Sequence, residues 1–462
     1  MVNKLIMICI DALRADVLFN RQEFCNKYQI KSQIVTPNLD WLLDRSLKLT
    51  KCINTSPYTT ASHASIFTGY WPKNNSVKDF FKNSLTKKTI YDLLHDEGYE
   101  TFFKTDFPFI LGEHLGFKRG VDHYYIEDEI GALTDFSISK KNKFAFFHFA
   151  DVHWPYGFHR LDDDNERTIL KEFVTKESKA NNIKLSNKCM PGPIETIREE
   201  QDLILEQNYR RVIDYYCDKK KYNTIMEWYA NGVSRFDGGR FNKFIELLKQ
   251  NGSFDDPETM IVVFADHGEN WSDESYGHFN SCDLDVIRVP VLIHCSSIPK
   301  ESMDKLVRTI DLVPTIMEYL NIKKLEKFDG VNLFRNDPKN SITQSYVSDF
   351  RELVSFFGET KENGNFLEGQ ISSFLLKEAT VVGNEKLEIK YSNTGVVEYR
   401  KSSTIENGME KVSNHSFENE LGKYLTDYDQ GLEKNDTAKV IAEKKILSEF
   451  KNLGYFGGKD EK

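Results

Sequence analysis

The sequence stretch best suited to chemistry is Asp266-His267-Gly268-Glu269, which follows the apolar run 260–264. A carboxylate and an imidazole that adjoin at the end of a buried strand can both reach one divalent cation. The backbone must leave the sheet there, and Gly268 permits such a bend. A polar turn at a strand end would have the same composition, so this stretch alone leaves both interpretations open.

A second acidic residue stands in an equivalent place near the N-terminus. Asp11 directly follows the apolar run 5–10. In a parallel sheet, ligands bind beyond the carboxyl ends of the strands, so Asp11 can join Asp266 and His267 at one edge. Asp16, which follows soon after, is predicted to be structural.

Hydroxyl side chains gather in the segment 56–69, at the predicted start of a helix. A helix N-terminus offers unpaired N–H groups and a positive dipole end, which together suit a tetrahedral anion. A hydroxyl beside a metal ion can also lose its proton and become a nucleophile. Capping the helix would require only one such residue, and this run has several.

Short apolar runs that alternate with helix-like segments would position these residues. This alternation predicts an α/β fold with a central, mostly parallel sheet flanked by helices. The expected strands are 5–10, 144–149, 260–264 and 289–294, and the expected helices are 37–49, 89–95, 239–250 and 309–320.

Two further regions differ from this pattern. Residues 161–222 are rich in charge and are predicted to form a helical insertion within a catalytic domain that spans residues 1–335. Residues 336–462 are predicted to form a smaller C-terminal α+β subdomain. Its expected elements are a hairpin over 386–399 and a charged helix over 436–453.

Composition excludes several classes of protein. The 462 residues carry a formal charge of −10 and are 40% hydrophobic, which argues against disorder and against wholesale binding to nucleic acid or anionic membranes. The seven cysteines are scattered without CxxC pairs, which favours reduced thiols. No apolar run approaches the ~18 residues of a spanning helix, and the N-terminal run is shorter than that of a signal peptide. We therefore expect a cytoplasmic protein without a membrane span.

Taken together, the motifs resemble the alkaline phosphatase superfamily, and in particular its sulfatase-like family. The resemblance covers about residues 4–333 and implies the sandwich fold of that family. The matching motifs, in chain order, are Asp11 with Arg14 and Asp16, the nucleophile helix 59–69, Asp266-His267-Gly268-Glu269, the segment 277–290, and Asp311-Leu312-Val313-Pro314-Thr315 with Asp329-Gly330.

The departures from the family pattern narrow the chemistry. Sulfatases oxidise a cysteine to formylglycine at the position of Thr59, and a threonine does not undergo that conversion. The family's arginine in this motif falls on His63, and its second metal-binding aspartate falls on Ala12. Relatives with a threonine nucleophile mostly act on phosphate esters or transfer phospho-groups. This chain is similar to members of the phosphodiesterase, phosphonate monoester hydrolase and phosphoglycerol transferase types.

The resemblance implies roles for five more residues. His153, in a strand that ends in His-x-Pro, and His278 would protonate the leaving oxygen of the ester. Lys104 would stand in for a lysine that grips the anion, although the histidine of that family motif is missing. His63 and Arg14 would also bind the substrate.

The implied cofactor is one divalent metal ion held by Asp11, Thr59, Asp266 and His267. Such mixed ligation suits Mn, Zn or Mg, and the histidine makes Ca a poorer fit, although sulfatases mostly hold Ca. A second metal ion is not expected. Two-metal relatives use Asp-x-x-x-His, whereas Pro155 stands in that histidine's place after Asp151.

The favoured function is a metal-dependent hydrolase of phosphate or phosphonate esters, in which Thr59 forms a covalent phospho-enzyme. Its partner would be a small anionic ester that could be linked to a glycan. Three alternatives remain at this point: a sulfatase without formylglycine, a phospho-group transferase acting on a glycan or headgroup, and a non-catalytic binding protein with a decayed site.

Overall fold

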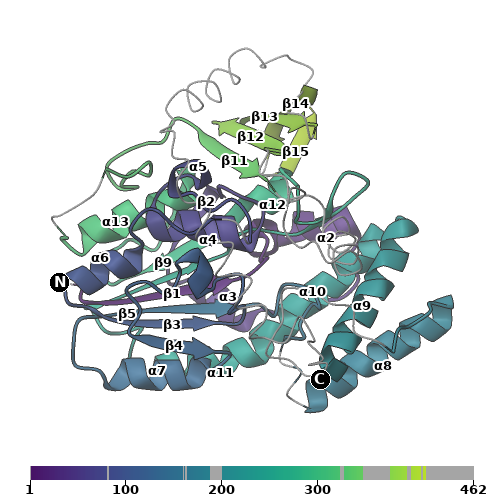
Figure 1. The fold of residues 1–462 in the computed structure, drawn as a ribbon, viewed down its shortest axis with the longest axis horizontal. Coiled ribbons are helices and arrows are strands. Elements are labelled where there is room, and N and C mark those ends of the chain that lie inside the picture. The colour runs from purple at the N-terminus through teal and green to yellow at the C-terminus, as the bar shows by residue number, and fades with distance from the viewer. Residues whose placement is uncertain are drawn as a thin grey trace, which may run out of the picture.

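Eight strands form the central sheet of the computed structural model, which confirms the expected α/β fold (Figure 1). The structure describes residues 2–80, 83–159, 161, 164–187, 200–322, 327–346, 375–392, 397–406 and 409–412. The strand order is β10-β2-β9-β6-β1-β5-β3-β4. Strand β9 is antiparallel to both neighbours, and the other neighbouring pairs are parallel. The strands are β1 (Lys4–Ile10), β2 (Leu47–Ile53), β3 (Glu100–Thr105), β4 (His123–Ile126), β5 (Lys143–Phe149), β6 (Thr259–Phe264), β9 (Arg288–His294) and β10 (Ser302–Arg308).

The middle of the sheet is buried on both faces. Strands β5, β6 and β9 are buried along their whole length, as expected for apolar runs in a sheet covered by helices. Strand β1 lies between β5 and β6, and Ile10 pairs with Phe149 while Cys9 pairs with Phe264. The three strands therefore end level with one another, so the residues that follow them meet at one edge.

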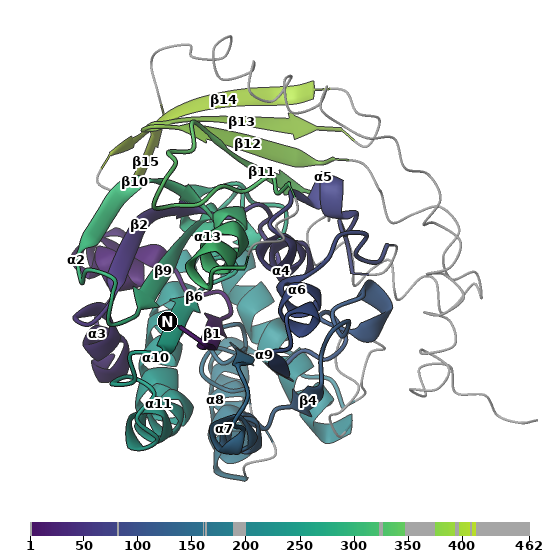
Figure 2. The same cartoon turned by 90° about the vertical axis from the view of Figure 1, so that its left-hand side faces the viewer.

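Helices cover both faces of the sheet (Figure 2). One group contains α4, α6 and α13, and the other contains α3, α10 and α11; within each group the helices contact one another. The helices are α1 (Ala15–Phe19), α2 (Arg21–Tyr28), α3 (Pro37–Leu43), α4 (Thr59–Thr68), α5 (Pro72–Asn75), α6 (Ile90–Asp96), α7 (Glu129–Ile138), α8 (Asp164–Asn181), α9 (Glu200–Asp218), α10 (Tyr222–Gly238), α11 (Arg240–Gln250), α12 (Leu284–Ile287) and α13 (Leu312–Tyr319), with short 3₁₀ turns η1 (Glu113–Leu115) and η2 (Thr309–Asp311).

The predicted helical insertion contains α8 and α9, which lie beside each other and extend away from the sheet in Figure 1. Helix α10 continues from α9 and packs against α2 and α3 on the sheet side. Among the described residues, no helix has both the length and the apolar character needed to cross a membrane.

A separate antiparallel sheet follows the central one in the chain and lies above it in Figures 1 and 2. The pairing of β13 with β14 confirms the expected hairpin, and the helix expected over 436–453 lies outside the described residues. The strands, in spatial order, are β11 (Ser341–Ser345), β12 (Lys377–Val382), β13 (Glu385–Tyr391), β14 (Val397–Glu406) and β15 (Met409–Val412).

This second sheet is joined to the central one close to helix α4. The backbone N–H of Gln344 donates a hydrogen bond of 2.9 Å to the Thr55 carbonyl. The Thr343 hydroxyl donates one of 2.6 Å to the Asn54 carbonyl. The C-terminal sheet is therefore tied to the backbone that leads into α4.

One sequence-based prediction about an element was wrong, and several strands were missed. The helix expected over 37–49 ends at Leu43, and β2 begins at Leu47, because the leucines at 47 and 49 alternate with polar residues in the two-residue period of a strand. Strands β3, β4 and β10 were not predicted. The six cysteines among the described residues are free thiols, in agreement with the expected reduced state.

Candidate active site

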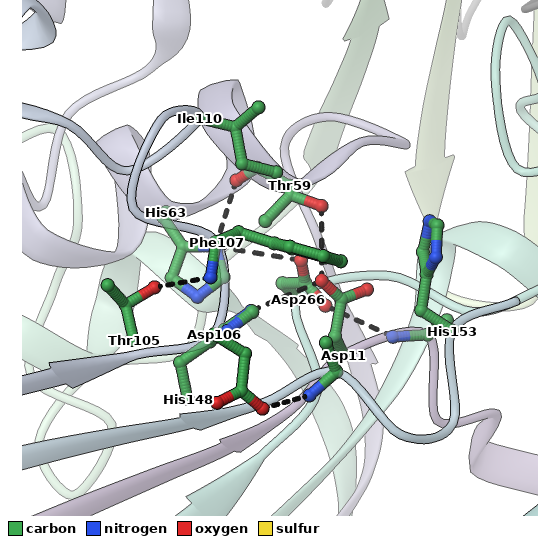
Figure 3. A network of polar contacts seen from close by, with 12 residues as sticks. Asp11, Thr59, His63, Thr105, Asp106, Phe107, Ile110, His148, His153 and Asp266 are labelled. Carbon is green, nitrogen blue, oxygen red and sulfur yellow. Dashed lines mark hydrogen bonds and ion pairs between the residues drawn. The ribbon is translucent and has the colours of Figure 1, made fainter. Parts of the chain in front are cut away.

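Strands β1 and β6 and helix α4 bring a hydroxyl and two carboxylates together (Figure 3), and an imidazole joins them. Asp11 follows β1, Asp266 and His267 follow β6, and Thr59 opens α4. Thr59 Oγ1 lies 3.3 Å from Asp11 Oδ2 and 3.3 Å from His267 Nε2. All four residues are at most 3% exposed, so the predicted metal ligands share one buried site.

The backbone bend after β6 depends on Gly268. A Cβ atom at this position would lie 2.1 Å from the Asp285 carbonyl oxygen, far inside contact distance. The Gly268 amide donates a hydrogen bond of 2.8 Å to the Val286 carbonyl. The close approach of these two segments turns the chain so that His267 faces Asp11 and Thr59.

The hydroxyls of α4 divide into anchors and one residue that faces the cluster. The Thr60 hydroxyl donates to the Ile110 carbonyl at 2.8 Å, and the Ser62 hydroxyl donates to the Asp266 carbonyl at 2.8 Å. Both bonds fix the first turn of α4 against neighbouring segments. The Thr59 hydroxyl instead points toward the carboxylates, at the helix end where amide N–H groups are unpaired.

The carboxylate and imidazole atoms of this cluster fit a divalent cation. His267 Nδ1 donates to the Gly268 carbonyl at 2.9 Å, so its Nε2 presents a lone pair. That Nε2 atom lies 3.4 Å from Asp11 Oδ1 and 3.5 Å from Asp266 Oδ2, and these two buried oxygens have no hydrogen-bond partner in the part of the chain that the structure describes. One donor atom from each of the three residues lies within 4.8 Å of the others.

The electrostatics of the cluster favour the same interpretation. Burial, together with the nearby charge of Asp11, raises the pKa of Asp266 to about 7. Burial lowers the pKa of His267 to about 4, which keeps the imidazole neutral. Two carboxylates in a buried site repel each other, and a bound cation would remove that repulsion.

His278 and His153 line the same site. The His278 ring stacks on His267 with centroids 4.1 Å apart, and His153 lies 5.1 Å from His278. His153 Nδ1 donates to the Trp154 carbonyl, so its Nε2 presents a lone pair. Burial lowers the pKa of His153 to about 4, and burial with the nearby Arg210 lowers that of His278 to about 3.

Glu269 is a site residue whose role the sequence did not reveal. Its Oε1 atom lies 3.3 Å from His278 Nδ1, and its Oε2 atom accepts a hydrogen bond of 3.1 Å from the Tyr156 hydroxyl. The Trp271 indole N–H donates to the same hydroxyl at 2.8 Å. Glu269 thus orients His278, and Tyr156 and Trp271 in turn hold Glu269 in position.

Arg14 lies beside the site but directs its donors to the protein. Its guanidinium is fully buried and donates to Asp16, to Asp285, to the Glu269 carbonyl at 2.6 Å and to the Tyr28 hydroxyl at 3.0 Å. These contacts join the segment after β1 to the segment after β6. The Arg14 guanidinium is therefore saturated by the protein.

Lys104 and His63 are likewise fully buried and engaged. Lys104 Nζ donates to Asp106 Oδ1 at 2.5 Å and to the His148 carbonyl at 2.6 Å. His63 Nδ1 donates to the Thr59 carbonyl at 2.9 Å. The structure places both side chains behind the cluster, under the residues that line it.

His148 is a further residue that the sequence did not reveal. It lies within β5, and its Nε2 atom is 3.1 Å from Asp11 Oδ2. The run 144–149 indicated only a buried strand. The one available signal was a histidine inside an otherwise apolar run.

Asp151, the position at which two-metal relatives place a ligand, forms an ion pair. Its Oδ2 atom lies 2.9 Å from Arg240 Nη1. The same guanidinium contacts Asp106 at 2.8 Å and Glu129 at 2.7 Å. Arg240 therefore supplies positive charge beside Asp151.

The last family motif holds the far end of α4. The Gly330 amide donates to the Gly69 carbonyl at 3.0 Å. The Val331 amide donates to Asp311 Oδ1 at 2.9 Å. These bonds fix the C-terminal end of the helix whose first residue is Thr59.

A family model described as Sulfatase matches residues 3–322, which is more than half of the chain. The chain belongs to the sulfatase family. This membership makes it an ester-bond hydrolase, and members of the family are generally metal-dependent. A search of curated protein sequences gives no significant match.

Solved structures share the fold at low sequence identity. BT4656, solved in complex with its substrate D-glucosamine-2-N,6-O-disulfate, is 12% identical with a TM-score of 0.64, covering 94% of this chain and 99% of its own. The phosphonate monoester hydrolase of Silicibacter pomeroyi is 15% identical with a TM-score of 0.57, covering 92% and 94%. An alkaline phosphatase superfamily protein of Vibrio parahaemolyticus is 14% identical with a TM-score of 0.50, covering 97% and 88%.

Proposed function

We propose that this member of the sulfatase family hydrolyses phosphate or phosphonate esters, with Thr59 as the nucleophile. The observation that carries the proposal is the position of Thr59 Oγ1, 3.3 Å from both Asp11 Oδ2 and His267 Nε2 at the start of α4. A threonine supplies its hydroxyl directly, whereas formylglycine chemistry requires a cysteine at this position. The unpaired amides at the helix start suit the oxygens of a phosphoryl group.

Asp11, Asp266, His267 and Thr59 would hold one divalent cation on the substrate side of the sheet edge. When bound, it would lower the pKa of the Thr59 hydroxyl and offset charge on the non-bridging oxygens of the ester. Carboxylates combined with an imidazole suit Mn, Zn or Mg better than Ca.

We do not propose a second ion at Asp151. Its carboxylate lies 2.9 Å from the Arg240 guanidinium, which supplies positive charge there. Pro155 also stands where two-metal relatives have a histidine. The positive charge of Arg240 thus stands where two-metal relatives have a second metal ion.

In the proposed reaction, Thr59 loses its hydroxyl proton to solvent, and its Oγ1 atom attacks phosphorus in line with the leaving oxygen. His153 uses Nδ1 for the Trp154 carbonyl, so its Nε2 atom is the one that, when protonated, would donate the proton that the leaving alcohol needs. An anionic ester nearby favours that protonated form, which burial otherwise disfavours. Water then cleaves the Thr59 phospho-ester, with His278 held for this step by Glu269.

We propose positioning roles for the three residues that the resemblance implied to bind substrate. Arg14 fixes the segment after β6, Lys104 holds the His148 carbonyl, and His63 holds the Thr59 carbonyl. In each case the donor that would grip an anion is directed at a protein oxygen. Their replacement should affect folding and metal binding more than substrate affinity.

The test is the activity of Thr59→Ala against aryl phosphates, aryl phosphonate esters and aryl sulfates, with the metals assayed in parallel. We expect Thr59→Ala to lose turnover while it folds normally, and Thr59→Ser to retain part of it. Thr60→Ser is the matched control, because the Thr60 hydroxyl bonds the Ile110 carbonyl outside the cluster. Near-full activity in Thr59→Ala would refute the proposal.

Sulfate ester hydrolysis is the second candidate. The family match and the sulfated substrate of BT4656 favour it over the phosphate ester, whereas Thr59 favours phosphorus. A higher kcat/KM for aryl sulfate than for every phosphorus ester would select this candidate. Product analysis with alcohol acceptors separates hydrolysis from transfer, and the metal content of the purified protein tests for a decayed site.

A glycan-linked ester is the substrate class that we propose for either chemistry. Trp154 is half-buried and adjoins His153, so its ring could stack on a sugar. The Arg210 guanidinium lies 5.2 Å from the Trp154 ring and is itself engaged by Asp214 and by the Tyr276 hydroxyl, so it helps to hold that ring. A panel of phosphorylated and sulfated monosaccharides tests this class.

A further inference from the structure

Directly behind the catalytic cluster lies a second group of potential metal ligands. Cys9 of β1, His63 of α4 and His148 of β5 are all fully buried. One ligand atom from each lies within 4.8 Å of the others. Cys9 and His148 are register partners across the parallel β1–β5 pair, so the sheet itself holds two of the three ligands.

Hydrogen bonds on the outer side fix which nitrogen of each imidazole is free. His63 Nδ1 donates to the Thr59 carbonyl at 2.9 Å. His148 Nε2 donates to Asp11 Oδ2 at 3.1 Å. His63 Nε2 and His148 Nδ1 therefore carry lone pairs, and both are buried without a hydrogen-bond partner among the described residues.

The rings around these nitrogens offer no polar substitute. His63 contacts the rings of Phe67, Phe146 and Phe264, and His148 contacts those of Phe107 and Phe146. Buried polar atoms almost always have a partner, so two unpartnered imidazole nitrogens beside a thiol require an explanation. A bound cation would satisfy both nitrogens at once.

We propose that Cys9, His63 and His148 form a second metal site, for Zn²⁺, that supports the catalytic cluster from behind. One thiolate and two neutral imidazoles are ligands typical of zinc. Tetrahedral zinc holds its ligand atoms about 3.5 Å apart, and these atoms lie within 4.8 Å of one another, so they need to close by about 1.3 Å at most. The Cys9 thiol would release its proton to solvent on binding.

The site would hold both imidazoles in the tautomers that the catalytic cluster uses. Zinc on His63 Nε2 keeps the Nδ1 proton on the Thr59 carbonyl, and zinc on His148 Nδ1 keeps the Nε2 proton on Asp11. The effect of this zinc ion on catalysis by Thr59 depends on the proposed function. The binding of zinc by Cys9, His63 and His148 does not depend on it. The proposed ion is distinct from one at Asp151, which pairs with Arg240.

The experiment is cobalt binding to the full chain after metal removal and reconstitution. Cobalt replaces zinc at such sites, and a thiolate–cobalt bond produces a charge-transfer absorption that oxygen and nitrogen ligands do not. We expect this absorption in the native chain with about two Co²⁺ bound. Cys9→Ser should lose this absorption and should bind about one Co²⁺ per chain.

Two controls make the result specific. Cys52→Ser removes another buried thiol, in β2, and should keep the absorption. His267→Ala removes a ligand of the catalytic cluster and should also keep it while binding about one Co²⁺ fewer. Native protein that folds normally and binds cobalt without the charge-transfer absorption overturns the second site. Absorption with only about one Co²⁺ per native chain supports the second site and argues against the catalytic metal instead.

Discussion

Replacing the buried Arg14 should cost stability rather than substrate affinity. Its guanidinium is fully buried and lies 2.8 Å from Asp285 and 2.5 Å from Asp16, whose side chains are only 13% and 15% exposed. It also donates to the Glu269 carbonyl and lies over the rings of Phe24 and Tyr28. Arg14→Met keeps most of the side-chain volume and removes all of these donors.

Removing one member of a buried ion pair costs about 3–5 kcal/mol, because the remaining charge stays buried and unpaired. The two carboxylates keep some contact with water, so we expect about 3 kcal/mol for Arg14→Met. Arg21→Met is the matched control. Its ion pair with Asp40 is 30% and 45% exposed, which predicts a loss below about 1 kcal/mol.

The assay is urea unfolding followed by tryptophan fluorescence, with KM measured on the same preparations. In the native chain burial alone would raise the pKa of Asp285, but Arg14 and Lys27 lower it to about 2. Its stabilising contribution is therefore present above the unfolded pKa of about 3.9 and is lost as the pH falls through about 2. In Arg14→Met only Lys27 remains to oppose the effect of burial, so the pKa of Asp285 rises and the stability difference between the two proteins should narrow between about pH 5 and pH 2.

Two results would refute this reasoning. The first is Arg14→Met that unfolds within about 1 kcal/mol of the native chain, as expected of an exposed pair. The second is a selective rise in KM at unchanged stability, which would mean that the guanidinium contacts substrate after all. A double variant with Asp285→Asn should recover part of the lost stability, because the buried charge that has lost its Arg14 partner and keeps only Lys27 is then absent.

Three further outcomes are expected. Gly268→Ala should lower the free energy of unfolding, measured by thermal unfolding, by more than about 2 kcal/mol, because its Cβ would lie 2.1 Å from the Asp285 carbonyl oxygen. Gly238→Ala is the control and should be neutral or stabilising, because no atom lies within 4 Å of the added Cβ. Equal effects of the two substitutions would contradict this prediction. Glu269→Gln should lower kcat about 10–100-fold in steady-state assays through the loss of His278 orientation, and an unchanged kcat would remove that role. Removal of the metal with a chelator should abolish turnover and lower the melting temperature. A ligand at 100 times its Kd stabilises the folded state by about 2.7 kcal/mol, and the chelator would remove that contribution. A melting temperature unaffected by the chelator would argue against a bound metal ion.

The residues of the catalytic cluster that could be predicted from the sequence are those that follow buried strands. Asp11 and Asp266 each come directly after an apolar run, and level strand ends bring such residues together. Thr59 was predictable because a run of hydroxyls preceded a helix. Local patterning and strand topology together suffice for residues of this kind.

The sequence did not reveal the residues that support the cluster, because the partners of these residues lie far away in the chain. His148 contacts Asp11 across 137 positions, and Arg14 contacts the Glu269 carbonyl across 255. Nothing near His148 in the sequence distinguishes it from a core residue of β5. The substrate-binding roles implied for Arg14 and Lys104 came from motif position alone, which does not show whether a donor faces the pocket or the interior.

The bonds between β11 and the segment before α4 have a consequence for how the chain is made. Asn54 and Thr343 are 289 positions apart, so the backbone leading to Thr59 lacks this partner until a further 289 residues have been synthesised. At ribosomal rates of about 5–20 residues per second, that delay lasts roughly 15–60 s. During this interval the nascent chain would carry Thr59 on an unfinished support, so any activity that depends on Thr59 should appear only after Thr343 has been synthesised and has left the ribosome.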